Sequence, residues 1–143
     1  MFETRRLTVP GRFDSLAQIS DFIAQAARDA GLDEDGVFHV QMAVDEACSN
    51  VIEHAYAESL GDIDLECHVD AGGDLRVEIR DQGGPFDPES VSPPPVTNGS
   101  VDIDEMKIGG LGLFFMRKLM DEVTFRFDAA TGNHLTMVKR RRT

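Results

Sequence analysis

Two polar side chains, Glu46 and Asn50, have the chemistry and the spacing for work on phosphate groups. Residues four apart in a helix lie about one turn apart on the same face. The amide oxygen of Asn50 is a hard ligand of the kind that Mg²⁺ binds, and the carboxylate of Glu46 can take a proton from an attacking nucleophile. Such a pair more often belongs to a solvated helix surface, so both interpretations stay open at this point.

The apolar residues around this pair predict a helix from about residue 34 to 57. At 100° per residue, Glu46, Asn50 and Glu53 fall within a narrow arc. Small and branched apolar residues gather on roughly the opposite side: Val37, Val40, Val44, Cys48, Val51 and Ala55. One side of this helix is therefore predicted to pack and the other to carry chemistry.

A second candidate site begins at Asp81, where a predicted strand runs into the glycine- and proline-rich segment 82–88. A carboxylate at a strand end can accept a hydrogen bond from the exocyclic amine of a nucleobase. Gly83 would let a flat ring approach the backbone closely, because glycine has no side chain. A plain turn is the alternative interpretation of these residues.

A third candidate site is the glycine-rich segment 109–112, which opens a helix predicted to reach about Met120. Free amide groups at a helix N-terminus attract phosphate, and glycine removes the side chains that would block it. A tight helix entry with no ligand is the alternative. No Gly-Lys-Ser/Thr follows, and no strand directly precedes, so neither a Walker loop nor a dinucleotide fingerprint is present.

The other patterns predict the elements that must position these sites. Period-two alternation indicates strands at about 2–9, 62–69, 75–80, 123–127 and 135–137, the last two closing the chain. Ser15 and Gln18 form a possible capping box for a helix that Gly31 is placed to end. Residues 82–108 show no periodicity, and the flanking motifs favour a functional lid over a disordered segment.

This order of elements predicts the fold class. Strands and helices do not alternate as in a doubly wound fold, so we expect an α+β two-layer sandwich in a single domain, residues 1–143. A mostly antiparallel sheet of about five strands would be covered on one face by three helices.

Composition narrows the possible partners and compartment. The net charge of -12 and the pI near 4.6 argue against direct nucleic-acid binding and suit a protein partner with basic patches. Cys48 and Cys67 lack metal or redox spacing and are predicted to be buried free thiols in a reducing cytoplasm. We expect no membrane association and no signal peptide, hence a cytoplasmic protein.

Taken together, the three candidate sites resemble the N, G1 and G2 boxes of the GHKL superfamily, the Bergerat-fold or histidine-kinase-like ATPases. Two strings, Glu-Ala-x-x-Asn-x-x-x-His-Ala-Tyr at 46–56 and Asp-x-Gly-x-x-Phe-Asp-Pro at 81–88, look most like the anti-sigma-factor serine/threonine kinases. The resemblance covers nearly the whole chain. It implies that the chain binds ATP or ADP with Mg²⁺ and that residues 82–108 form the ATP lid.

The resemblance also assigns roles to residues. Glu46 would be the general base, Asn50 the Mg²⁺ ligand and Asp81 the adenine contact. The remaining ATP-binding positions would lie against the adenine or the phosphates: Gly83, Lys107, Gly110, Gly112 and Thr136. Lys107 stands where relatives often have an arginine that reaches the terminal phosphate, and because lysine lacks the guanidinium fork, slower phosphate transfer is expected.

The function implied by the resemblance is that of an anti-sigma-factor protein kinase. It would phosphorylate a serine or threonine of an anti-anti-sigma antagonist, sequester a sigma factor, and form a homodimer as relatives do. The alternative is a non-catalytic partner-switching module, in which bound nucleotide only orders the lid and shapes a protein-binding surface.

Overall fold

The main sheet of the protein has five strands, each antiparallel to its neighbours, in the order β1-β2-β3-β7-β6. The computed structural model describes residues 3–55, 61–82, 96–97, 100–101, 115–128 and 130–141. The five strands are β1 (Arg5–Pro10), β2 (Asp62–Val69), β3 (Leu75–Asp81), β6 (Glu122–Asp128) and β7 (Gly132–Lys139). A separate antiparallel pair is formed by β4 (Val96–Thr97) and β5 (Ser100–Val101).

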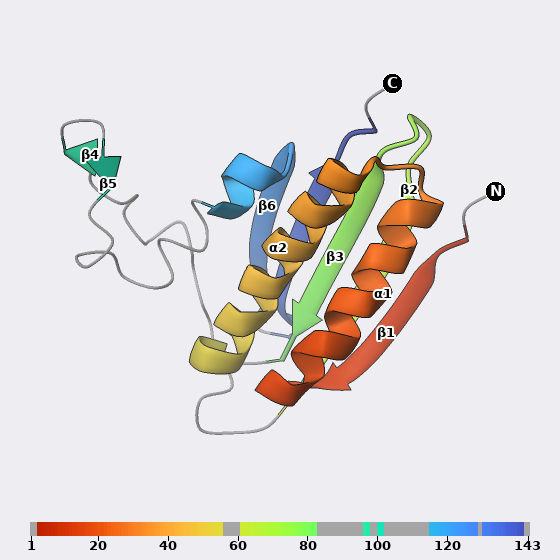
Figure 1. Cartoon of the computed structure of the whole chain (residues 1–143). Helices are drawn as coiled ribbons and strands as arrows, with labels where there is room; N and C mark the ends of the chain where they lie inside the picture. The colour runs from red at the N-terminus through yellow and green to blue at the C-terminus, as the bar shows by residue number, and fades with distance from the viewer. Residues whose placement is uncertain are drawn as a thin grey trace.

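Helices cover one face of the main sheet, as Figure 1 shows. A short 3-10 turn, η1 (Phe13–Ser15), leads into α1 (Leu16–Asp29), which packs against α2 (Glu34–Asn50). A third helical segment spans residues 115–119. The predicted two-layer α+β sandwich, with five antiparallel strands and three helices on one face, is confirmed. None of the described helices is long and apolar enough to cross a membrane.

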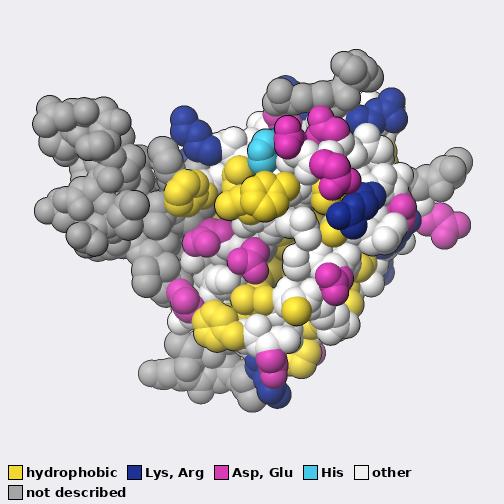
Figure 2. Space-filling view, viewed as in Figure 1, with side chains coloured by type: hydrophobic (Ala, Val, Ile, Leu, Met, Phe, Trp, Pro, Cys, Tyr) yellow, Lys and Arg dark blue, Asp and Glu magenta, His cyan; other side chains and the backbone are white. Residues whose placement is uncertain are grey.

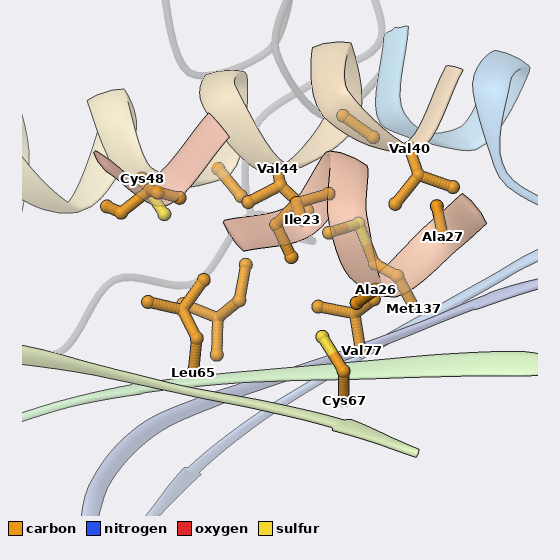
Figure 3. Close-up of a cluster of buried hydrophobic side chains, with 14 of the residues drawn as sticks. Ile23, Ala26, Ala27, Val40, Val44, Cys48, Leu65, Cys67, Val77 and Met137 are labelled. Carbon is orange, nitrogen blue, oxygen red and sulfur yellow. The ribbon is translucent and has the colours of Figure 1, made fainter. Parts of the chain in front are cut away.

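The core lies between α1, α2 and the sheet, and the strands show the predicted alternation of buried apolar and outward-facing polar residues. Ile63 and Leu65 of β2 and Val77 and Ile79 of β3 are buried, while their polar neighbours face away from the core. In Figure 3, Ile23 and Val44 from the helices point toward Leu65 and Val77 from the sheet. Each such buried side chain contributes about 1.5–3 kcal/mol of transfer free energy, so these strands and helices order one another.

The two cysteines are free and lie in this core, as predicted. Burial raises the pKa of the Cys67 thiol to about 12 and raises that of Cys48 further. Both thiols therefore stay protonated and unreactive at neutral pH.

The ends of the helices differ in part from the predictions. The predicted capping box is wrong: the Ser15 hydroxyl donates a hydrogen bond of 2.8 Å to the carbonyl of Pro10, and no side chain caps α1. The 3-10 turn before α1 puts Ser15 in a helical conformation, which removes the extended geometry that a cap needs. Gly31, at φ +92°, ends α1 as predicted. Asp33 caps α2, because its carboxylate accepts from the Gly36 amide at 2.7 Å.

The second helix is predicted as one element, and the structure divides it. The α-helix ends at Asn50 and continues as a π-helical turn, η2 (Val51–Ala55); residues 56–60 lie outside the described part. The change of helix type therefore falls directly after one of the two candidate polar residues. Such turns inside α-helices occur frequently at functional sites.

Candidate functional site

The last two turns of α2 carry Glu46 and Asn50 one turn apart, and the two side chains have different environments. Glu46 is half-buried, whereas Asn50 is only 4% exposed. The helix holds them in place through its own packing, because Val44, Ala47 and Cys48 on its inner side are buried in the core. The backbone that presents the two polar groups is thus anchored over the sheet.

The side-chain amide of Asn50 is the most unusual polar group in the described part of the chain. Both its oxygen and its nitrogen are buried, and neither has a hydrogen-bond partner there. A buried amide without a partner costs about 1–3 kcal/mol of stability, so proteins rarely keep one without a reason. A ligand that meets the amide would remove this cost. A carbonyl oxygen is a suitable ligand for Mg²⁺, so this residue fits the metal that the sequence predicts.

Electrostatics favour the proton-accepting role of Glu46. Burial raises the pKa of its carboxyl group, and the neighbouring carboxylates of Asp45 and Glu53 raise it further. A raised pKa makes a carboxylate a better proton acceptor. The same three carboxylates make this end of α2 strongly negative, which suits a site that takes a cation.

The third polar group of the site, Asp81, ends β3 and is held by a residue of the neighbouring strand. Asn133 lies directly opposite Asp81 in the pairing of β3 with β7, and its amide nitrogen donates a hydrogen bond of 2.9 Å to the Asp81 carboxylate. Both side chains are 4% exposed. The hydrogen bond fixes the direction of a buried carboxylate, which is what recognition of a flat base requires.

Asn133, and not the predicted Thr136, is the residue of β7 beside the Asp81 carboxylate. Side chains alternate between the faces of a strand, so Thr136 lies on the face opposite to Asn133. It is paired there with Glu78 of β3 and Thr124 of β6, on the sheet face that the helices do not cover. Thr136 therefore cannot share a pocket with the Asp81 side chain. The sequence contains the signal, because Leu135 and Met137 are the apolar residues of this strand, and Asn133 continues their alternation.

The remaining predicted site residues lie outside the described part of the chain: Gly83, Lys107, Gly110 and Gly112. Of the predicted lid, the structure describes Gln82 and the short strands β4 and β5. The segment that follows the third candidate site is described from residue 115, and Met116 and Met120 anchor it in the core.

Gly132 allows the close approach of β7 to the end of β3. Its φ is +90°, and a Cβ atom there would lie 2.1 Å from the carbonyl oxygen of Asp81. Because the obstacle is backbone, no rotation of a side chain can relieve the contact. Any other residue would push apart the strands that carry Asp81 and Asn133.

We expect Gly132→Ala to lower the free energy of unfolding by about 2–3 kcal/mol, from the strained φ together with the backbone clash. Urea denaturation measures this change. The matched control is Gly73→Ala, because Gly73 has φ +88° and nothing within 4 Å of an added Cβ. The control should lose only about 1 kcal/mol; equal losses in the two variants would show that the approach to Asp81 is not tight.

We expect Asn133→Ala to weaken nucleotide binding, because the Asp81 carboxylate loses the donor that orients it, and to cost about 1–3 kcal/mol of stability. Thr136→Val should leave nucleotide affinity unchanged, since it alters the opposite sheet face. Calorimetric titration of both variants with ADP separates the two positions. A loss of affinity in the Thr136 variant alone would restore the original assignment.

Comparison with known proteins gives matches over most of the chain. The model of the histidine kinase-like ATPase domain family matches residues 9–139. The serine-protein kinase RsbW of Halalkalibacterium halodurans is 35% identical over an alignment of 141 residues, and the match covers 96% of this chain and 83% of that protein. The protein of the same name from Listeria innocua is 33% identical over an alignment of 130 residues, and that match covers 87% of this chain and 79% of that protein.

Solved structures show the same fold. The chain resembles the structure of the RsbU and RsbW domains of a Mycobacterium tuberculosis protein, with a TM-score of 0.69 at 18% identity. That match covers 96% of this chain and 32% of the solved one. The histidine kinase domain of a blue-light activated kinase from Erythrobacter litoralis is similar at a TM-score of 0.55 and 19% identity, covering 88% of this chain and 59% of the other.

Proposed function

Because this chain belongs to the histidine kinase-like ATPase domain family, among the serine-protein kinases of the RsbW type, we propose that it transfers the terminal phosphoryl group of ATP to a serine or threonine of a partner protein. The observation that carries the proposal is the buried, unpartnered amide of Asn50, one helical turn from Glu46. This amide makes no hydrogen bond within the described part of the chain, and it suits a metal-nucleotide ligand.

Each site residue has a role that follows from the chemistry of its side chain. The Asp81 carboxylate, held by Asn133, accepts a hydrogen bond from the exocyclic amine of adenine. Asn50 would hold Mg²⁺, which neutralises charge on the phosphates when it is bound. Gly83, Lys107, Gly110 and Gly112 keep the roles that the resemblance gave them, against the base and the phosphates.

Glu46 acts on the acceptor hydroxyl. It takes the hydroxyl proton while the hydroxyl oxygen forms a bond to the terminal phosphorus of ATP. The bond from that phosphorus to the bridging oxygen breaks, and ADP leaves with the electron pair. The burial that raises the pKa of Glu46 makes its carboxylate better suited to hold this proton.

The biological setting that we propose is partner switching in the cytoplasm. The acceptor is an anti-anti-sigma antagonist, the unphosphorylated antagonist competes with a sigma factor for this chain, and the chain acts as a homodimer of one domain per protomer. The segment 82–108 serves as the ATP lid. These proposals rest on the family and on the relatives' name, and the acidic balance of the chain suits partners with basic surfaces.

Incubation with γ-labelled ATP, Mg²⁺ and candidate antagonist proteins from the same genome tests the proposal. We expect label on one serine or threonine of an antagonist, and no label when that residue is replaced by alanine. ATP binding without any transfer would favour the non-catalytic module. In that case, ADP release measured with and without the antagonist would show whether the nucleotide only shapes a surface.

A further inference from the structure

An apolar pair stands exposed on the outward side of α2. Phe38 and Met42 are 58% and 44% exposed and lie four residues apart, so they are neighbours on the helix surface. A third large exposed apolar side chain, Phe115, belongs to the adjacent helical segment. Figure 2 shows hydrophobic side chains gathered over this region of α2 and the segment beside it. Single exposed apolar residues are ordinary, whereas contiguous exposed apolar patches are typical of interaction sites.

The surface under this pair is held rigidly. The buried ammonium group of Lys139 donates a hydrogen bond of 2.6 Å to the carbonyl of Leu119 and lies 3.2 Å from Nδ1 of His39. Leu119 belongs to the 115–119 segment, and His39 belongs to α2, where it follows Phe38. One buried side chain therefore ties the two helices together, and a partner would meet a preformed surface at little entropic cost.

Two carboxylates frame the apolar pair. Asp35 precedes Phe38 by three residues and Asp45 follows Met42 by three, and all four fall within an arc of about 80° at 100° per residue. Both aspartates are exposed, and within the described residues neither takes part in an ion pair. Helix α2 contains no lysine or arginine. The two charges are ten residues apart, about 15 Å along the helix axis.

We propose that this surface, Asp35, Phe38, Met42 and Asp45, docks an amphipathic helix of a partner protein whose apolar stripe is flanked by Lys and Arg. The apolar side chains of such a helix cover Phe38 and Met42, and its cations meet the two aspartates. A helix is the matching shape because both the apolar spacing and the 15 Å charge spacing run along one helix axis. The inference goes beyond the proposed function, since it needs no nucleotide chemistry. Glu46 follows Met42 by four residues, so the docked partner lies one turn from the proposed base.

The probe is a synthetic amphipathic helical peptide of about 18 residues, with a leucine stripe and lysine or arginine on both flanks. A second peptide carries glutamate in place of the cations. Fluorescence anisotropy measures the binding of each labelled peptide to the full chain. We expect the basic peptide to bind at low salt, the acidic peptide not to bind, and the affinity to fall as salt is raised.

Two pairs of variants locate the binding surface. The double variant with Phe38→Ala and Met42→Ala should bind the basic peptide at least about tenfold more weakly. Its control is Phe13→Ala, which removes a phenylalanine of similar exposure (55%) from η1 and should leave peptide binding unchanged. Asp35→Lys with Asp45→Lys should abolish binding of the basic peptide and permit binding of the acidic one. The control is a pair of charge reversals of equal net charge elsewhere, at Asp21 and Asp14.

The proposal is overturned if the basic peptide does not bind, if both peptides bind alike, or if the control variants lose affinity as much as the variants of α2. ADP titration of the same variants keeps this test separate from the proposed function. If the α2 variants bind ADP and still bind the peptide like the wild type, the docking proposal fails and the proposed function stands. If the wild type binds the peptide but no ADP, the proposed function fails and the docking proposal stands.

Discussion

Replacing Asn50 by leucine is expected to stabilise the free protein and to remove magnesium-dependent nucleotide binding. The two effects have one cause, because the amide that would hold the metal is buried without a partner in the described part of the chain. A leucine of similar size fills the space without an unsatisfied polar group, so the free energy of unfolding should rise by about 1–3 kcal/mol. Affinity for ATP with Mg²⁺ should fall at least about a hundredfold.

Urea denaturation without nucleotide and calorimetry with ATP and Mg²⁺ measure the two effects of this substitution. Asn50→Asp is the matched control, since it keeps an oxygen ligand while placing a charge in a buried site. The aspartate variant should be less stable than the leucine variant, and it should bind ATP with Mg²⁺ more tightly than the leucine variant does. A leucine variant that is destabilised and keeps its affinity for ATP would show that Asn50 is a packing residue.

The second large effect is expected at Glu46. Glu46→Gln keeps the shape of the side chain and removes its ability to take a proton, so phosphoryl transfer to the acceptor protein should slow by about 10²–10⁴-fold. ATP affinity should change little, because the base meets the acceptor hydroxyl and not the adenine. Single-turnover transfer assays, together with calorimetry, separate the chemical step from binding.

The pH dependence gives this prediction a second readout. A general base works only when it is deprotonated, so transfer should fall as the pH decreases through the raised pKa of Glu46, at a higher pH than for a glutamate whose pKa is not raised. Asp45→Asn removes one of the carboxylates that raise this pKa, and it should move the fall in activity to lower pH. A rate profile that the Asp45 variant leaves unchanged, or full activity of Glu46→Gln, would assign the proton to another group.

The elements with a clear period could be predicted from the sequence, because their pattern is local. The alternation in 63–69 and 75–79 gave two strands with the correct buried face, and the helix carrying Glu46 and Asn50 was placed within a residue or two at its start. Ser15 shows the limit of local motifs. A capping box requires an extended residue before the helix, and the 3-10 turn that replaces it depends on how the chain leaves β1.

The composition of the candidate site could be predicted only in part, because its contacts are non-local. Asp81 and Asn133 are 52 residues apart, and they meet because β7 inserts beside β3 in one register. No spacing rule predicts that register, so the contact between Asp81 and Asn133 could not be foreseen. The resemblance assigned Thr136, although the alternation along its strand already places it on the other face. The missing partner of the Asn50 amide is likewise a property of packing, since the sequence only shows an asparagine on a helix.

Calorimetric titration of the folded wild-type chain with ATP, in the presence and absence of Mg²⁺, tests the central claim most directly. We expect one nucleotide per chain in the presence of Mg²⁺, with affinity that falls sharply when the metal is chelated. Titration of the folded protein without any heat of nucleotide binding would contradict the claim that Asn50 and Asp81 belong to one nucleotide site.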